Sequence, residues 1–378
     1  MLLKFGARNF YCFKDGIEIS LELGAHCPDT ISHGKPISNL LCVKGANGSG
    51  KTNVLKILGF LNFFCCHSFA VKPDDKIAVD PFFNNNDPIE LYCNFIVDDI
   101  RYLYELSLDR DHVLSEKLSR TIKRQTTVFE RTKDKLYTTR EFAALKQVKL
   151  RANASVISTA FQYETSCMLP IYSFFDSINV NVNWLGRMNV YRDYRQVAKY
   201  YQENPDVLSR SVSIIKECDL GISDISIRAL KEENGQEHFF PIFKHDTKVR
   251  DNQLLFHSQS LGTQTLFNSL PLYIAVLEHG GILVMDEFDT DFHPHILAKI
   301  VSFFDDETVN QKNAQMIFSS HNTDILEYMG KYRTVLVNKE ESESYGYRLD
   351  EIAGDIIRND RPIIPVYNSG KIGGVPRI

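Results

Sequence analysis

The sequence predicts an α/β fold built on a mixed sheet, with an antiparallel portion near the N-terminus and an insertion in the middle. Short apolar runs bounded by polar turns, at 282–285, 316–319 and 334–338, are typical of buried parallel strands. Apolar residues at helical spacing occupy segments between them, at 265–278 and 295–304. Closer to the N-terminus, strict alternation of apolar and polar residues indicates antiparallel hairpins.

Two hairpins and a glycine-rich turn make up the N-terminal part. Residues 3–23 alternate on either side of a turn at 14–16, which predicts a two-stranded hairpin. A second hairpin is predicted at 89–108, with its turn at 98–99. Between the hairpins, the apolar run 39–43 enters a glycine-rich turn that a helical pattern follows at once. A strand, a tight turn and a helix are therefore expected there.

The middle of the chain has a different composition. Residues 111–220 are richer in Lys, Arg, Tyr and Gln, with helical signals at 141–148 and 206–218. We interpret this stretch as an inserted, partly helical arm. The chain is therefore expected to divide into an N-terminal lobe at 1–110, the arm at 111–220 and a C-terminal lobe at 221–378.

Charge and composition exclude several classes of protein. The formal charge of −5 and the pI near 6.1 argue against a protein that coats nucleic acid non-specifically, although a local basic groove is compatible with them. The eight cysteines form no CxxC pair and favour reduced, buried thiols. We find no secretory pattern and no apolar run near the roughly 18 residues of a membrane helix. We therefore expect a cytoplasmic protein without membrane contact.

The strongest motif lies at 45–52, which matches G-x-x-x-x-G-K-[ST] at every defined position. Its glycines would let backbone N–H groups wrap a β-phosphate, Lys51 would bridge the β- and γ-phosphates, and Thr52 would bind Mg²⁺. A glycine-rich turn that carries Lys-Thr by chance is the alternative, and the strand before and the helix after argue against it. The predicted nucleotide-binding residues are Gly45, Asn47, Gly48, Ser49, Gly50, Lys51, Thr52 and Asn53.

Two acids end the apolar run at 282–285. Carboxylates at the C-terminal end of a parallel strand face the ligand crevice. Asp286 would hold Mg²⁺ opposite Thr52, and Glu287 would act as the general base that polarises the attacking water. A strand followed by two solvated acids also occurs by chance, so this motif gains its value from the phosphate loop at 45–52.

Two further segments are candidates for the same site. His321 follows the apolar run at 316–318 and could reach a γ-phosphate, or it could make only local hydrogen bonds. The segment 258–264 precedes a predicted helix, where Ser260 and Gly262 would form either an anion-binding cap or an ordinary helix cap.

The order of these motifs resembles the head of ABC-type ATPases of the SMC and OLD branch, which have a P-loop NTPase fold. The segment Ser260-Leu261-Gly262-Thr263-Gln264 is similar to the signature motif of that branch, His321 to its switch histidine, and 289–291 to its D-loop. More closely, the chain resembles stand-alone bacterial AAA-type ATP-binding proteins of this branch. The similar segments are the start at 5–15, the acids with His293-Pro294, and the tail at 367–376.

This resemblance implies an ATPase that uses ATP and Mg²⁺, hydrolyses slowly, and has Lys51, Glu287 and His321 as catalytic residues. It also implies a homodimer, or an assembly of dimers, in which Ser260, Gly262 and Thr263 of one subunit cap the nucleotide of the other. Many relatives occur in phage-defence operons such as PARIS, Septu and retron-linked systems, where the ATPase controls a separate nuclease or toxin. The segment 84–86 is the nearest match in position to the Q-loop of the family.

A DNA-binding, SMC-like repair ATPase is the alternative function. It rests on a run of basic residues in the predicted arm, in a chain that is acidic as a whole. A solvated face or a surface for a protein partner would explain the same run. The basic residues are Arg120, Lys123, Arg124, Arg131, Lys133, Lys135, Arg140, Lys146, Lys149 and Arg151.

Overall fold

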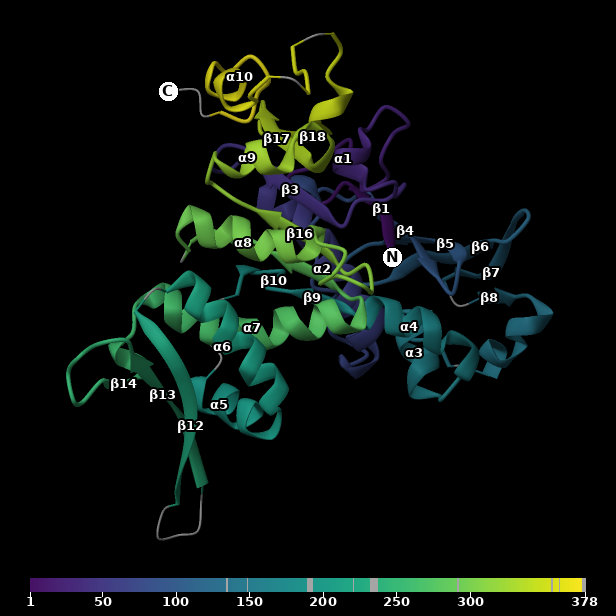
Figure 1. Cartoon of the computed structure of the whole chain (residues 1–378). Helices are drawn as coiled ribbons and strands as arrows, with labels where there is room; N and C mark the ends of the chain where they lie inside the picture. Colours follow the sequence, from purple (N-terminus) through teal and green to yellow (C-terminus); the bar gives the residue numbers. More distant parts are fainter. Residues whose placement is uncertain are drawn as a thin grey trace.

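A six-stranded sheet forms the centre of the molecule in the computed structural model (Figure 1), which describes residues 1–133, 135–147, 149–188, 193–219, 221–231, 237–290, 292–354, 356–359 and 361–375. Neighbouring strands are parallel, except that β17 and β18 are antiparallel. The predicted α/β fold with a mixed sheet is therefore confirmed. In spatial order the strands are β18 (Glu343–Arg348), β17 (Thr334–Glu340), β3 (Leu40–Lys44), β16 (Gln315–Ser319), β15 (Ile282–Met285) and β9 (Ile178–Val180).

Helices cover both faces of this sheet, and its side chains alternate between two cores. Leu41 and Val43 of β3 belong to the core that contains helix α2 (Lys51–His67). Leu40 and Cys42 belong to the core that contains α7 (Leu261–His279) and α8 (Pro294–Asp305). Because both faces are buried at the centre of the sheet, the strands β3, β16 and β15 are mostly apolar, which is the pattern that the sequence shows.

Helix α2 is the central helix of the fold. Together with the turn after it, at Lys51–Ala70, it is long and apolar enough to cross a membrane by length and composition alone, although no apolar run of that length was expected. Its residues Val54, Leu55 and Leu58 are fully buried. The helix lies between the two sheets, and contact with apolar groups all round accounts for its composition.

A seven-stranded antiparallel sheet lies beside the central one (Figure 1). It contains both predicted hairpins and three further strands from the region predicted as an arm. The insertion is partly helical, as expected, but it does not begin at 111, because the strands at 113–138 extend the antiparallel sheet. In spatial order this sheet contains β2 (Ile17–Ser20), β1 (Leu2–Arg8), β4 (Ile89–Val97), β5 (Ile100–Leu108), β6 (Val113–Thr121), β7 (Gln125–Thr132) and β8 (Lys135–Thr138).

Buried charges and basic outer faces explain why these strands were missed. Leu118 of β6 and Phe129 of β7 are fully buried, whereas the turns and outer faces carry the Lys and Arg residues that gave the region its distinct composition. Two charged side chains, Glu116 and Arg131, are also buried there and form an ion pair at 3.6 Å. Buried charges interrupt the alternation of apolar and polar residues on which strand prediction depends.

Helices follow this sheet. Helices α3 (Val156–Gln162) and α4 (Leu169–Asp176) pack against α2. The helix predicted at 206–218 is α6 (Pro205–Cys218), and α5 (Tyr194–Glu203) precedes it. The segment predicted as a helix at 141–148 is instead a 3₁₀ segment at Arg140–Gln147, and Val148 lies outside the described residues.

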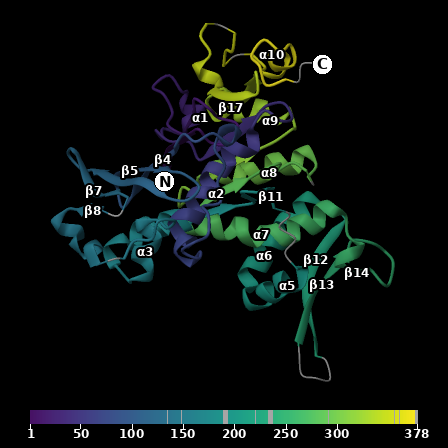
Figure 2. The same ribbon diagram turned by 180° about the vertical axis from the view of Figure 1, so that it is seen from behind.

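The element that projects from the body is a hairpin, not a helical arm. Figures 1 and 2 show its long strands extending away from the two sheets. It lies beyond the boundary predicted at 220, within the lobe that was expected to contain the signature. The hairpin consists of β12 (Ile222–Lys231), β13 (Glu237–His245) and the short β14 (Gln253–Leu255).

Short elements complete the chain. A third core at its C-terminal end joins Leu326, Leu336 and Leu349 with the tail residues Tyr367 and Ile372. The remaining elements are α1 (Asp29–Ser32), β10 (Val182–Asn183), β11 (Gly186–Arg187), α9 (Ile325–Met329) and α10 (Ile364–Asn368).

Candidate nucleotide site

The predicted phosphate loop joins β3 to α2. A Cβ atom at Gly45 would lie 2.3 Å from the carbonyl oxygen of Val337, so only glycine fits at this position. Gly50 has a φ of 111°, a conformation that favours glycine, and α2 begins directly after it. The unpaired backbone N–H groups of the helix N-terminus therefore adjoin the loop, which is the arrangement that binds phosphate groups.

Lys51 is held within the loop. Its Nζ donates hydrogen bonds to the carbonyl oxygens of Gly45 at 2.9 Å and Ala46 at 3.0 Å. Burial lowers the pKa of Lys51, and the negative charge of Asp286 opposes that change. Anionic phosphate oxygens would be stronger acceptors for this ammonium group than the two carbonyl oxygens.

Asp286 is the centre of a hydrogen-bond network at the end of β15. Its Oδ2 accepts from Thr52 Oγ1 at 2.7 Å, and its Oδ1 accepts from Ser319 Oγ at 2.5 Å. Asn181, the residue after β9, donates to the carbonyl oxygen of Asp286 at 3.1 Å and accepts from its N–H at 2.7 Å. The carboxylate is thus fixed against Thr52, on the phosphate-loop helix.

Glu287 lies in a strained turn next to Asp286. Its φ of 48° is uncommon for a residue other than glycine. Its N–H donates to Ser319 Oγ at 2.8 Å, so one hydroxyl contacts both acids. Carboxylate oxygen Oε1 lies 4.0 Å from Nε2 of His321, and Oε2 lies 2.7 Å from Nη1 of Arg187.

Asp289 holds the loop that carries His321. Its carboxylate accepts from the backbone N–H of His321 at 3.1 Å and from that of Asn322 at 3.0 Å. From the other side, Lys44 Nζ donates to the carbonyl oxygen of Asn322 at 2.8 Å. Of the predicted D-loop, Asp291 lies outside the described residues.

Phe288 connects this loop with α7. Its buried ring lies 6.1 Å from the ring of Tyr273 on α7 and 5.7 Å from that of Phe318 on β16. Its N–H donates to the carbonyl oxygen of Ser319 at 3.0 Å. A continuous set of contacts therefore leads from α7 to Asp289 and the His321 loop.

These groups meet in one open cleft of about 460 Å³, within the range of small-molecule sites in proteins. Both acids, His321 and most of the phosphate-loop residues line it. Gly45 and Ser49 are not at its surface. The lining residues are Cys12, Asn47, Gly48, Gly50, Lys51, Thr52, Asn53, Asp286, Glu287, His321 and Lys339.

The donor set suits Mg²⁺ bound together with a phosphate. Thr52 and Asp286 place a hydroxyl and a carboxylate oxygen 2.7 Å apart. Among the described residues, no group of three or more His, Cys, Asp or Glu side chains could hold a metal ion on its own. Mg²⁺ is typically held by one or two side-chain oxygens, water and substrate phosphates, so Thr52 and Asp286 would be its protein ligands.

The predicted signature residues lie elsewhere. Ser260 is the N-cap of α7, where its Oγ accepts from the N–H of Thr263 at 3.2 Å. Gly262 is in the first turn, and Thr263 Oγ1 donates to Asp219 Oδ2 at 2.7 Å. None of the three is among the described residues that line the nucleotide cleft.

Several residues of the site were not predicted. Asn181 and Arg187 contact the two acids, and Ser319 contacts both. The alternation of Ile178 and Val180 with Asn179 and Asn181 was the available signal, because these residues form β9 beside β15 and the position after it. The segment 84–86 does not line the cleft, since Asn85 bonds Asn9 and Asn84 bonds Arg110.

Strand order, phosphate loop and paired acids define a P-loop NTPase domain of the ABC-ATPase head type. The chain belongs to the AAA-domain family described as "AAA domain, putative AbiEii toxin, Type IV TA system", whose model matches residues 40–327. This match extends from β3 to α9 and includes the loop, the signature segment, both acids and His321. A comparison with curated proteins found no match.

Three solved structures of SMC heads are similar to the chain at low identity. One is an SMC head bound to the C-terminal winged-helix domain of ScpA, with 13% identity, 93% of this chain and 99% of that chain covered, and a TM-score of 0.49. The SMC head from Thermotoga maritima has 13% identity, coverage of 92% and 98%, and a TM-score of 0.44. An SMC head with an extended coiled coil, bound to the C-terminal domain of ScpA from Pyrococcus furiosus, has 11% identity, coverage of 93% and 97%, and a TM-score of 0.45.

Proposed function

We propose that this protein binds and hydrolyses ATP with Mg²⁺, and that two copies close around the nucleotide. The observation that carries the proposal is the single cleft into which Lys51, Thr52, Asp286, Glu287 and His321 all project. A loop that wraps phosphates, a carboxylate beside a hydroxyl, and a second carboxylate next to an imidazole are the groups that phosphoryl transfer to water requires.

In this proposal each group has one task. Lys51 leaves its carbonyl acceptors to bind the β- and γ-phosphates, and His321 contacts the γ-phosphate. Glu287 accepts a hydrogen bond from the attacking water and takes its proton. Mg²⁺, held by Thr52 and Asp286, would neutralise charge on the phosphates.

The proposed dimer is based on the open side of the nucleotide cleft. One side of the nucleotide would be covered by the chain's own groups, while the cleft stays open on the other. The N-terminus of α7, with Ser260, Gly262 and Thr263, lies outside the cleft of its own chain and presents backbone N–H groups that suit an anion. Supplied by a second copy, this helix end would complete the charge stabilisation and exclude water.

We further propose a role in phage defence, in which this ATPase controls a separate effector protein such as a nuclease or toxin. The description of the family as a putative toxin of a type IV toxin–antitoxin system supports a role of this kind. Resemblance to ATPases of defence operons supports it as well. Assemblies of several dimers are compatible with this role.

Mass photometry of the Glu287→Gln variant tests the dimer and the partner together. We expect the monomer to convert to a dimer on addition of ATP and Mg²⁺, and we expect ATP to change its complex with the protein encoded by the neighbouring gene. The same variant carrying Ser260→Arg should bind ATP but stay monomeric, because a bulky cation then occupies the helix N-terminus. Equal masses with and without ATP would contradict the closing dimer.

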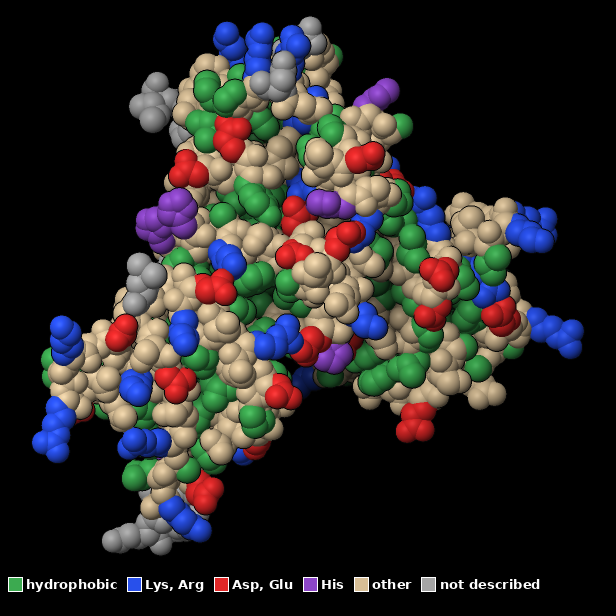
Figure 3. Space-filling model, viewed as in Figure 1, with side chains coloured by type: hydrophobic (Ala, Val, Ile, Leu, Met, Phe, Trp, Pro, Cys, Tyr) green, Lys and Arg blue, Asp and Glu red, His purple; other side chains and the backbone are tan. Residues whose placement is uncertain are grey.

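A DNA-binding role of the repair type has less support. Of the ten basic residues on which it rests, Arg131 is buried, Arg120 pairs with Glu141, and Arg151 donates to the carbonyl oxygen of Phe69. Lys123 lies at one end of the eight-residue strand β7 and Lys133 at the other, roughly 25 Å apart. On the face shown in Figure 3, Lys and Arg side chains are interspersed with Asp and Glu rather than gathered in one patch.

We therefore expect weak duplex DNA binding with a shallow dependence on salt, since few phosphates would be neutralised at once. Fluorescence anisotropy with a labelled duplex over a salt series measures both the affinity and its dependence on salt. Replacing Lys123 and Arg124 by Glu should change the affinity for DNA no more than replacing Lys199 and Lys216, two exposed lysines of α5 and α6, by Glu. Tight binding with a steep salt slope that the first pair abolishes would favour the repair function.

A further inference from the structure

A short hairpin connects the phosphate-loop helix with the two acids. Its strands β10 and β11 follow β9 and pair Val182 with Arg187. On one side, Lys56 Nζ of α2 donates to the carbonyl oxygen of Trp184 in the hairpin turn at 3.0 Å. At its base, Met188 N–H donates to the carbonyl oxygen of Asn181, the residue that bonds Asp286. The hairpin therefore has a defined position relative to both parts of the site.

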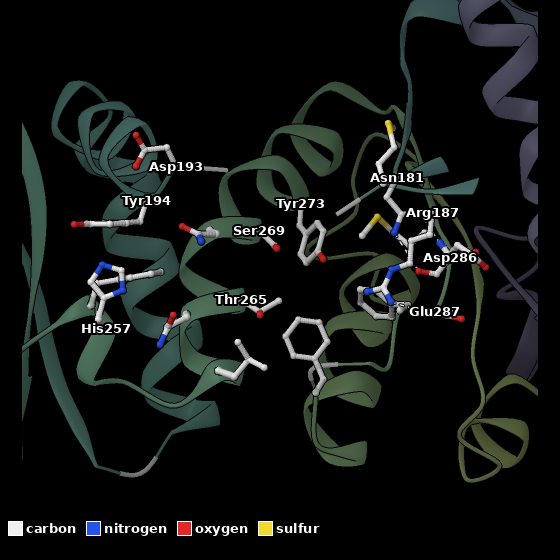
Figure 4. A pocket seen from close by; sticks show the side chains of 18 residues that line it. Asn181, Arg187, Asp193, Tyr194, His257, Thr265, Ser269, Tyr273, Asp286 and Glu287 are labelled. Carbon is white, nitrogen blue, oxygen red and sulfur yellow. Dashed lines mark hydrogen bonds and ion pairs between the residues drawn. The ribbon is translucent and has the colours of Figure 1, made fainter. Parts of the chain in front are cut away.

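Arg187 of this hairpin contacts the predicted general base. Its Nη1 lies 2.7 Å from Glu287 Oε2 and 2.9 Å from Thr290 Oγ1. Figure 4 shows the guanidinium directed at Glu287, across a second cavity from Thr265 and Ser269 of α7. Arg187 lines that second cavity and not the nucleotide cleft, whereas Glu287 lines both. Arg187 thus holds the carboxylate from the side away from the nucleotide.

A carboxylate held in this way is poorly placed to accept a hydrogen bond from the attacking water. The ion pair directs Oε2 to Arg187, which lines the second cavity and not the nucleotide cleft. The hydrogen bond also occupies Oε2, one of the two oxygens that could accept from the attacking water. Among the described residues Nε of Arg187 is buried without a hydrogen-bond partner, so only Nη1 secures the pair. A single contact of this kind can open more readily than a bidentate one.

We propose that Arg187 is a positioning residue that holds Glu287 in a resting position, so that turnover requires this ion pair to open. The inference rests on the proposed function, because it assumes that Glu287 is the base for ATP hydrolysis. Arg187 itself contacts neither nucleotide nor water in this scheme. Its position on a hairpin anchored to α2 makes opening a matter of moving one short element.

Steady-state kinetics of Arg187→Gln test the proposal. We expect kcat for ATP hydrolysis to rise about fivefold, the factor that loss of one partly exposed ion pair allows. The KM for ATP and the affinity for a fluorescent ATP analogue should stay within about twofold of wild type, since Arg187 lies outside the nucleotide cleft. Arg187→Lys should keep the low rate. Arg101→Gln is the matched control, because it removes an exposed Arg–Glu pair on the antiparallel sheet.

The double variant Arg187→Gln/Glu287→Gln should fall to the rate of Glu287→Gln alone, which a change in overall packing would not produce. An equal or lower kcat for Arg187→Gln, with wild type active, would overturn the resting role and leave the proposed function intact. If neither wild type nor Arg187→Gln exceeds Glu287→Gln although both bind the nucleotide analogue, the proposed hydrolysis and the resting role both fail.

Discussion

Replacing Glu287 by glutamine is expected to lower kcat for ATP hydrolysis by about 10²–10⁴-fold, the usual contribution of a general base. Glutamine keeps the size of the side chain but cannot take a proton from water. Nucleotide binding should persist, because Lys51, Thr52 and Asp286 are untouched. Phosphate release measured beside nucleotide affinity separates the two effects.

Glu217→Gln provides the control for this substitution. Glu217 is an exposed glutamate of α6 that pairs with Lys299 at 2.8 Å and is outside the nucleotide cleft. The kcat of the Glu217→Gln variant should match that of wild type. If Glu287→Gln hydrolyses ATP at the rate of this control, Glu287 is not the base.

Replacing Arg131 by methionine is expected to lower the free energy of unfolding by about 3–5 kcal/mol, the cost of breaking a buried ion pair from one side. Arg131 donates to the carbonyl oxygens of Ala154 and Arg151, both at 2.6 Å, and pairs with the fully buried Glu116. Methionine fills similar space but removes the cation paired with that carboxylate, which keeps its hydrogen bonds from Tyr104 Oη and Val156 N–H, and takes a donor from both carbonyl groups. Urea unfolding followed by circular dichroism measures the loss.

The loss should be smaller in acid buffer. Burial raises the pKa of Glu116 in the folded protein, and Arg131 opposes this. Without Arg131 the folded state favours the protonated form of Glu116 more strongly. The contribution of Glu116 to the variant's free energy of unfolding is therefore greatest below the pKa that this carboxyl has in the unfolded chain. It is lost as pH rises through the pKa of Glu116 in the folded protein. Arg120→Met, at an exposed pair with Glu141, is the control and should change stability little. Equal stability of both variants would contradict the buried pair.

Local patterns predicted the elements whose burial is uniform. Strand β15 has the predicted limits, because four apolar residues between polar turns have few alternative structures. The phosphate loop was found for a similar reason, since it needs glycine at fixed positions and lies between a strand and a helix. Such features depend on neighbours in sequence and therefore appear in the sequence.

Features that depend on distant residues were missed. Arg131 was counted in the basic run of the predicted arm, because nothing in the sequence shows that β6 and β7 bury it against Glu116. Arg187 belongs to a hairpin of two-residue strands, too short for any periodicity, and it meets Glu287 one hundred positions away. Long-range charge pairing of this kind becomes visible only after the sheets have been assembled.

The contacts around Phe288 have a consequence for how such a protein would respond to nucleotide concentration. The ring of Phe288 links α7, whose N-terminus carries Ser260, to Asp289 and so to the His321 loop. In a dimer closed as proposed, the α7 N-terminus of one copy would report on the ATP of the other copy, while His321 serves its own. Occupancy of one cleft would then favour the active geometry of the other, and the rate would rise with ATP as a sigmoidal curve.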